Sequence, residues 1–210
     1  MKILHEGSQP GVPQTNAVIE RTNQDIVCGA RSCLDAAGLP PCFWSFAAPC
    51  YCLLENKAPK LADVGVSSWF KNHNAEFEGL RVPFGCKVIH MPSDTKSTTE
   101  KGKWDAPTSV GVFAGYRMKP GYTWHVEYLV WDLAEFADLD FSLDGARLGR
   151  TFSEPHVSKR LSIYGDGISF PLKVEYGRVN HTLEGIKAQT SSEAGGIDAA
   201  DPCASFCSRR

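Results

Sequence analysis

The chain has 210 residues, a hydrophobic fraction of 42% and a formal net charge of −2 at pH 7. This length allows one ordinary domain or two small ones, and the hydrophobic fraction is sufficient for a core, which excludes a wholly disordered protein. With this nearly balanced charge, the chain as a whole lacks the clear basic excess that is typical of a dedicated DNA-binding domain, so its net charge gives no support for such a function.

The sequence shows no signal for a membrane or for secretion. No uninterrupted apolar stretch reaches the ~20 residues that a spanning helix needs, and the N-terminus lacks a basic start followed by an apolar segment. Five of the eight cysteines lie among apolar residues between positions 28 and 52, without the paired spacing of a zinc site, so we interpret them as reduced core residues. We therefore expect no membrane partner and an intracellular location, cytoplasmic or nuclear.

The first predicted helix begins near Asn16 and ends at Gly38, after a loop over residues 1–14 that contains several prolines and glycines. Asparagine is a good N-cap. The apolar residues that follow keep close to helical spacing: Ile19, Ile26, Ala30, Cys33 and Ala37. Glu20 lies away from this stripe, where solvation is the ordinary expectation for a carboxylate.

A second helix is predicted over about residues 42–56, after a break at Leu39-Pro40-Pro41. Phe43 and Phe46 lie on its main apolar face, and Trp44 makes the other side apolar as well. We expect such a helix to be buried between layers.

From residue 80 the pattern is typical of strands. Short β-rich runs bounded by Pro, Gly and Ser occupy residues 80–91, 109–116, 128–133 and 157–164. Several short strands separated by turn signals predict a small barrel. Residues 170–176 form a further candidate edge strand, and the chain from Lys187 onward is expected to be disordered because it has almost no large apolar residue.

Two segments resemble parts of a retroelement integrase. Residues 13–23 (Pro-Gln-Thr-Asn-Ala-Val-Ile-Glu-Arg-Thr-Asn) resemble the last catalytic segment, in which a Pro-Gln-x-Asn-Gly loop opens a helix and a glutamate four residues past the asparagine holds metal. Residues 36–44 resemble the Gly-Leu-Pro-x-x-Phe-Trp stretch that follows this helix in copia-type integrases. The strands from residue 84 resemble the SH3-like domain of copia-type polyproteins, with Phe-Gly-Cys, Gly-Val-Phe-Ala-Gly-Tyr and a tyrosine-valine-tryptophan return.

The resemblance, which covers roughly two thirds of the chain, implies an α+β fold. Residues 1–60 would be the C-terminal helices of a truncated RNase H-like integrase core, 61–79 a linker, 80–164 a small SH3-like β-barrel, and 165–210 an extension with a disordered tail. Because core strands of that family come mostly from upstream, we expect the helix faces through Ile19 and Phe43 to lack a cover. This predicts aggregation or a homo-oligomer.

The resemblance also implies the activity of the intact parent, which is integration of element DNA into target DNA. Strand transfer uses two divalent ions, and Mg²⁺ prefers several convergent carboxylates. Glu20 would be the catalytic third metal ligand. The sequence before it offers only Glu6 as an acid, so the two aspartates of the family are missing. We expect that this chain alone neither binds Mg²⁺ nor catalyses integration.

Candidate DNA-binding residues fall in two groups. Gln14, Asn16 and Arg21 surround the loop and helix start, where Asn16 has the alternative role of a plain N-cap and Arg21 that of an ion-pair partner of Glu20 or Asp25. Ala17 replaces the usual glycine, which puts close DNA approach in doubt. The second group is basic and interleaved with aromatic residues, which could instead form barrel core: Lys101, Lys103, Arg117 and Lys119.

Two alternatives remain open. Beside the integrase interpretation, the chain could be a non-catalytic, co-opted module that binds nucleic acid or protein. It could also be part of a longer reading frame that begins upstream. The six histidines show no ligand spacing. The acidic run 132–144 is followed by a basic strip (Arg147, Arg150, Lys159 and Arg160), which either faces phosphate or is a solvated loop that pairs with its acidic neighbour.

Overall fold

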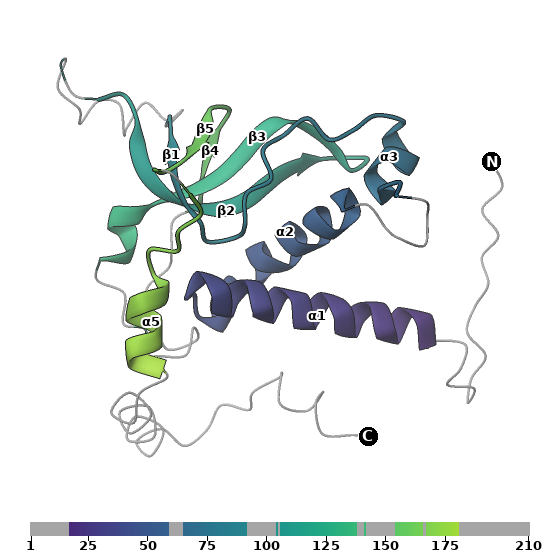
Figure 1. The fold of residues 1–210 in the computed structure, drawn as a ribbon, viewed down its shortest axis with the longest axis horizontal. Coiled ribbons are helices and arrows are strands. Elements are labelled where there is room, and N and C mark those ends of the chain that lie inside the picture. The colour runs from purple at the N-terminus through teal and green to yellow at the C-terminus, as the bar shows by residue number, and fades with distance from the viewer. Residues whose placement is uncertain are drawn as a thin grey trace.

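The computed structural model describes residues 17–58, 65–91, 104, 106–137, 141, 154–165 and 167–180 (Figure 1). Gln14, Asn16, Lys101, Lys103 and the predicted disordered tail lie outside these residues. In chain order the elements are α1 (Ala17–Ala37), η2 (Pro41–Phe43), α2 (Trp44–Lys57), α3 (Ser68–His73), β1 (Lys87–His90), β2 (Ser109–Lys119), β3 (Thr123–Asp132), η4 (Leu133–Phe136), β4 (His156–Ser158), β5 (Leu161–Ile163) and α5 (Lys173–Asn180). No helix within the described ranges combines the length and the apolar composition needed to cross a bilayer.

The five strands form one antiparallel sheet in the order β4-β3-β2-β1-β5. Helices plus an antiparallel sheet agree with the predicted α+β class. The sheet is open, which differs from the expected closed barrel. Its two edge strands, β4 and β5, are each three residues long and are not paired with each other. Only Lys159 and Arg160 join them. The single hydroxyl proton of Ser158 is shared between the carbonyls of Met91 (3.0 Å from Oγ) and Arg160 (2.7 Å). Since so short a connection must span from one edge to the other, the sheet curls strongly.

The helix α2 packs against the sheet (Figure 1). The Phe43 ring contacts those of Trp131 (5.1 Å between centroids) and Phe136 (6.0 Å), and Phe46 contacts Trp131 at 4.9 Å. Phe43 is 3% exposed. The prediction that this face lacks a cover is therefore wrong, because the chain's own downstream strands provide the apolar surface that we expected only from upstream ones.

Burial along α1 changes at its middle. Ala30, Leu34 and Ala37 in the second half are buried, but in the first half Val18 is 79% exposed and Ile19 61%. The expected exposure of Ile19 is confirmed. The helix thus belongs to the core at its C-terminal end and presents uncovered apolar side chains at its N-terminal end.

Two further segments differ from the expectations. The segment predicted as a linker contains α3, which Ser67 caps by accepting a hydrogen bond from the Phe70 N–H at 3.1 Å. The predicted edge strand over residues 170–176 is wrong, since α5 begins at Lys173 and the Tyr176 N–H donates to the Leu172 carbonyl at 3.0 Å. A short apolar run after a proline fits a helix start as well as a strand, and its periodicity does not separate the two.

Candidate functional site

Glu20 and Arg21 lie in the first turns of α1, and both are exposed. Within the described ranges, the one group of three or more potential metal-ligating side chains is formed by other residues, and Glu20 is not a member. A single exposed carboxylate does not fit a Mg²⁺ site, which needs several convergent oxygens.

Arg117 and Lys119 lie near the end of β2, where the hairpin to β3 brings both beside Glu127. The Glu127 carboxylate is 3.0 Å from Lys119 Nζ and 3.8 Å from Arg117 Nε. The hydrogen bond from Lys119 is the main cause that lowers the pKa of Glu127. The two cations are therefore partly neutralised before any phosphate approaches.

The aromatic residues near these cations serve mainly as cover for the hairpin. Tyr116 is 6% exposed, its hydroxyl donates to the Leu80 carbonyl at 2.8 Å, and it accepts from the Val82 N–H at 3.0 Å. Trp124 donates from Nε1 to the Glu127 carbonyl at 3.1 Å. These contacts support the alternative that the aromatic side chains stabilise the fold. Tyr122 is 38% exposed, and its hydroxyl accepts a hydrogen bond from Asn56 Nδ2 at 3.2 Å.

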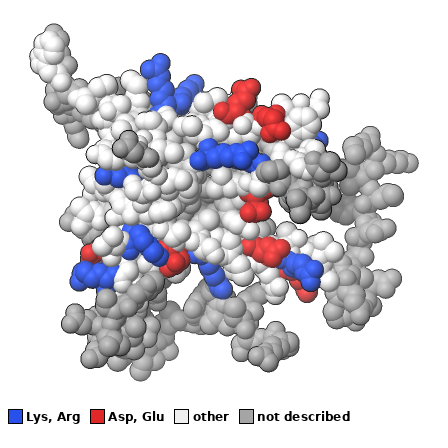
Figure 2. All heavy atoms as spheres, viewed as in Figure 1, with Lys and Arg blue, Asp and Glu red and all other residues white. Residues whose placement is uncertain are grey.

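The charged side chains are mixed on the face shown in Figure 2, where acidic and basic groups alternate over the sheet and helices. This face shows no continuous basic strip among the described residues. On this face, attraction to DNA would therefore come from small local groups of cations rather than from a continuous strip.

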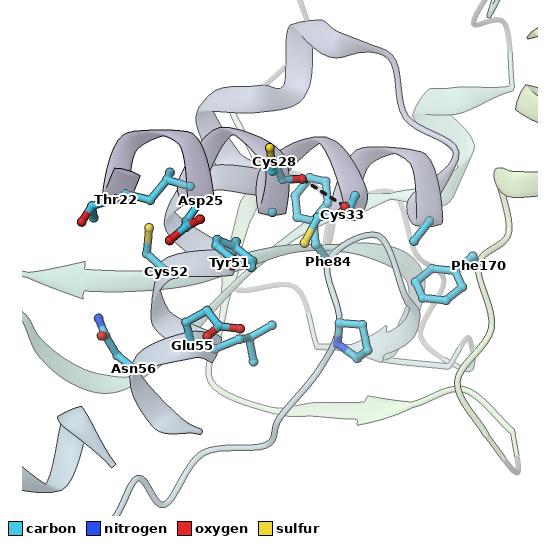
Figure 3. Close-up of a pocket in the computed structure, with 16 residues that line it drawn as sticks. Thr22, Asp25, Cys28, Cys33, Tyr51, Cys52, Glu55, Asn56, Phe84 and Phe170 are labelled. Carbon is cyan, nitrogen blue, oxygen red and sulfur yellow. Dashed lines mark hydrogen bonds between the residues drawn. The ribbon is translucent and has the colours of Figure 1, made fainter. Parts of the chain in front are cut away.

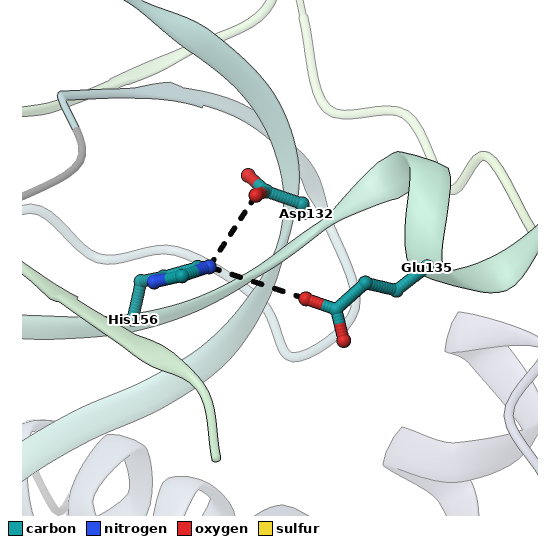
Figure 4. A group of neighbouring side chains, drawn as sticks. All are labelled: Asp132, Glu135 and His156. Carbon is teal, nitrogen blue, oxygen red and sulfur yellow. Dashed lines mark ion pairs between the residues drawn. The ribbon is translucent and has the colours of Figure 1, made fainter. Parts of the chain in front are cut away.

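A polar cluster lies where β3 ends (Figure 4). His156 Nε2 is 3.3 Å from Asp132 Oδ2 and 4.0 Å from Glu135 Oε1, and the three ligand atoms lie within 4.8 Å of one another. His90 Nε2 contacts the other carboxylate oxygen, Asp132 Oδ1, at 3.0 Å. The side chains of Asp132, Glu135 and His156 are 28%, 24% and 18% exposed, whereas that of His90 is fully buried.

The sheet register explains how these residues meet. His156 pairs directly with Val130 on β3, which places it on the same face as Asp132 two residues further along. His90 belongs to β1 and must reach across β2 to contact Asp132. Gly111 on β2 is paired with Asp132 and leaves the space that this requires, since a Cβ at position 111 would lie 3.1 Å from the His90 ring.

This cluster was missed from the sequence. The sequence marks Asp132 and Glu135 only as members of the acidic run 132–144, and the histidines lie 42 and 24 positions away from Asp132 along the chain. The signal available was a pair of acids three residues apart at the end of a predicted strand. Only the strand order brings the imidazoles to them.

A second feature that the sequence did not indicate is a buried lysine. Lys57, at the end of α2, is 1% exposed, and its Nζ lies 3.4 Å from the centroid of the Phe77 ring and 3.8 Å from that of Tyr116. Nζ has no hydrogen-bond partner among the described residues. Burial is the main cause that lowers the pKa of Lys57 from its ordinary 10.5 to about 7.

A groove of about 840 Å³ lies between α1 and α2 (Figure 3). Asp25 on α1 faces Tyr51, Cys52 and Glu55 on α2, whereas the Cys28 sulfur points away from them. Burial raises the pKa of the Cys52 thiol, so it is a poor nucleophile at neutral pH. Among the described residues that line the groove, apolar and acidic side chains are present and no basic one, which suits a protein segment better than a nucleic acid.

Among curated proteins, the chain is similar to the Retrovirus-related Pol polyprotein from transposon TNT 1-94 of Nicotiana tabacum, with 35% identity over 118 residues. This supports a retrotransposon Pol origin. The alignment covers 54% of this chain but only 8% of that polyprotein. No protein-family model and no solved structure matches the chain.

Proposed function

We propose that this chain is a fragment of a retrotransposon integrase, whose intact parent binds DNA and integrates it with Mg²⁺ as cofactor. The fragment itself is proposed to contact nucleic acid without catalysing strand transfer. The Pol relative supports the retrotransposon origin. The integrase assignment is carried by Glu20, which follows Asn16 by four positions in the sequence, the spacing of the family segment that residues 13–23 resemble.

The exposure of α1 is compatible with this proposal. In the parent, Glu20 would meet two further carboxylates on an adjoining layer, so the helix around it must present a surface that this chain leaves open. Glu20 is exposed, and Val18 and Ile19 beside it are uncovered apolar side chains. Large exposed apolar groups in contiguous positions are typical of contact surfaces.

The proposed DNA contact is tested by titrating the full chain with labelled duplex DNA and measuring the dissociation constant against salt concentration. Each phosphate contact that is lost reduces the slope of log K against log salt by about 0.9. We expect Lys119→Ala to reduce the slope by roughly that amount, and Glu127→Gln to strengthen binding because it releases Arg117 and Lys119 from their ion pairs. Arg178→Ala is the matched control, since Arg178 is also paired with a glutamate, Glu175, but lies on α5.

The catalytic part of the proposal has a separate test. The chain alone, with Mg²⁺ and a processed element end, should give no strand-transfer product, and the same chain extended upstream to include two aspartates should give product that Glu20→Gln abolishes. Activity of the extended protein that survives Glu20→Gln would refute the role given to Glu20. DNA binding that does not change with salt would refute the phosphate contacts.

The alternative function is a non-catalytic module that binds a protein partner, with DNA contact secondary. The groove between α1 and α2 and the uncovered first half of α1 favour it. Sedimentation of the full chain over a range of concentrations shows whether the partner at this surface is a second copy of the chain or a different protein. A change of Val18 and Ile19 to Ser would weaken self-association and leave the salt dependence of DNA binding unchanged.

A further inference from the structure

We propose that Asp132, Glu135 and His156 bind a divalent transition-metal ion at the end of β3. One imidazole nitrogen and two carboxylate oxygens are a ligand set that suits Zn²⁺ and Mn²⁺. The site involves none of the residues of the proposed integrase function: Glu20 lies on α1, whereas the three ligands belong to β3, η4 and β4.

The distances fit an ion after small side-chain rotations. Bonds of about 2.0–2.2 Å to nitrogen and oxygen place neighbouring ligand atoms roughly 3–3.6 Å apart around one ion. His156 Nε2 and Asp132 Oδ2 are already 3.3 Å apart, and Glu135 Oε1 is 4.0 Å from the same nitrogen. Glu135 has a flexible side chain, so its carboxylate can close the remaining gap. The imidazole nitrogen faces both carboxylates in Figure 4.

The surroundings hold the first ligand in place. His90 Nε2 binds Asp132 Oδ1, which leaves Oδ2 directed toward His156. Outer hydrogen bonds of this kind orient metal-ligating carboxylates. His90 is fully buried on the sheet, and its ring stands nearly parallel to that of His156, at 22° and 6.1 Å between centroids. The support is therefore a rigid part of the core rather than a mobile surface group.

The site is also open enough for an ion to enter. The three ligand side chains are partly exposed, in contrast to His90 beneath them. The sheet register fixes the positions of two ligands, His156 and Asp132. His156 is the direct partner of Val130, and Asp132 lies two residues after Val130 on the same face of β3. Glu135 comes from the 3-10 turn that starts directly after the strand. Ligands built on a sheet and the turn after it are more precise than ligands on long loops.

The experiment uses Mn²⁺, because thiolates select softer ions and the chain contains eight cysteines. The full chain is titrated with Mn²⁺, free ion is measured by electron paramagnetic resonance, and the bound position is mapped from the broadening of backbone amide signals. We expect saturation at one ion, with the strongest broadening at residues 130–136 and 154–158. Broadening centred on α1 near Glu20, or no binding at millimolar Mn²⁺, would overturn the proposal.

The variants test the ligands directly. Glu135→Gln keeps the size of the side chain and removes its charge, and His156→Gln removes the imidazole. Since loss of an outer-shell partner alone typically weakens metal binding about 10–100-fold, we expect each variant to raise the dissociation constant at least roughly 10-fold. Glu175→Gln on α5, where the glutamate is paired with Arg178, is the matched control and should leave it unchanged.

Folding is checked in parallel by thermal unfolding without metal. If His156→Gln unfolds, Glu135→Gln decides, because Glu135 is partly exposed and in a surface turn. Equal Mn²⁺ affinity of a folded Glu135→Gln variant and the unsubstituted chain would refute the site. A Mn²⁺-dependent rise in melting temperature that is present in Glu175→Gln and absent in Glu135→Gln would support it.

Discussion

The buried Lys57 makes a sharp prediction about stability against pH. The change is Lys57→Met, which keeps the length of the side chain, its contact with the rings of Phe77 and Tyr116, and the end of α2, and removes the amino group. Buried charges replaced by apolar groups of similar size are often neutral or stabilising. We expect the variant to be at least as stable as the unsubstituted chain at pH 7.

The direction of the pH effect follows from the folded pKa, which lies below the ordinary value. The unfolded chain keeps the Lys57 proton up to its ordinary pKa near 10.5, while the folded chain releases it from about pH 7. Above pH 7 the unfolded state therefore binds more protons, and the free energy of unfolding rises with pH. Attraction to two ring faces favours the charged form by up to ~2 kcal/mol and moves the start of the rise upward without reversing it.

The magnitude combines these two effects. A full pKa unit corresponds to about 1.4 kcal/mol, so from pH 7 to pH 9.5 the Lys57 contribution should be a rise of about 1 to 3 kcal/mol. The thiols act in the opposite direction in this range, because burial raises the pKa of Cys50 to about 12 and of other cysteines as well. The difference between the unsubstituted chain and Lys57→Met removes most of this background.

The assay is urea unfolding at several pH values, followed by tryptophan fluorescence. Lys87→Met is the control, since the Lys87 amino group also lies over an aromatic ring, 3.9 Å from the Tyr164 centroid, but Lys87 is only partly buried. We expect the pH-dependent difference for Lys57→Met and none for Lys87→Met. The same pH dependence in the unsubstituted chain and Lys57→Met would show that Lys57 is charged or solvated throughout.

Three further substitutions test the packing. Gly111→Ala would place a Cβ 2.5 Å from Val130 Cγ1 and 2.6 Å from a backbone oxygen on β3. We expect denaturant unfolding to show about 1–3 kcal/mol of destabilisation. Gly177→Ala is the control, because its Cβ would meet nothing within 4 Å, and it should be neutral or stabilising. Phe43→Ala should cost about 3–5 kcal/mol in one cooperative transition; two transitions would show that helices and sheet do not share a core. Tyr116→Phe leaves the Val82 N–H and the Leu80 carbonyl without their hydroxyl partner. We expect a loss of about 1–3 kcal/mol in the free energy of unfolding, measured in the same way. An unchanged free energy of unfolding would mean that water replaces the hydroxyl.

Local elements were predictable from the sequence because they depend on nearby residues. The helix that ends at Ala37 and the strands around Val112 and Val130 follow from periodicity, the turn glycine Gly38 and β-branched runs. The expected division between helices and strands did not indicate how the two would pack. Phe43 and Trp131 are 88 positions apart, and no local pattern states that their rings will meet.

The candidate cluster shows the same limit at the level of a site. His90, Gly111 and Asp132 lie on three neighbouring strands, so their meeting depends on the strand order and on register to a single residue. A shift of β1 by one residue would turn His90 to the other face. The nucleic-acid candidates Arg117 and Lys119 follow from a local pattern of cations interleaved with aromatic residues, but their shared partner Glu127 depends on the hairpin register.

The position of the exposed apolar surface bears on the proposed origin of the chain. If the helices had lost a required β layer over their whole length, Phe43 and Leu34 would be exposed, yet both are buried. On α1 and α2 the exposed large apolar side chains are Val18 and Ile19 beside Glu20, Val27 at the midpoint of α1, and Trp44 at the start of α2. Under the integrase proposal, an adjoining layer in the parent would therefore contact the first half of α1 and would leave the buried faces through Leu34 and Phe43 as they are. The core formed by α2 and the sheet would fold in either case, so removing Val18 and Ile19 as apolar groups should suppress self-association without changing the unfolding transition. A loss of stability on that substitution would instead mean that the first half of α1 is part of the core.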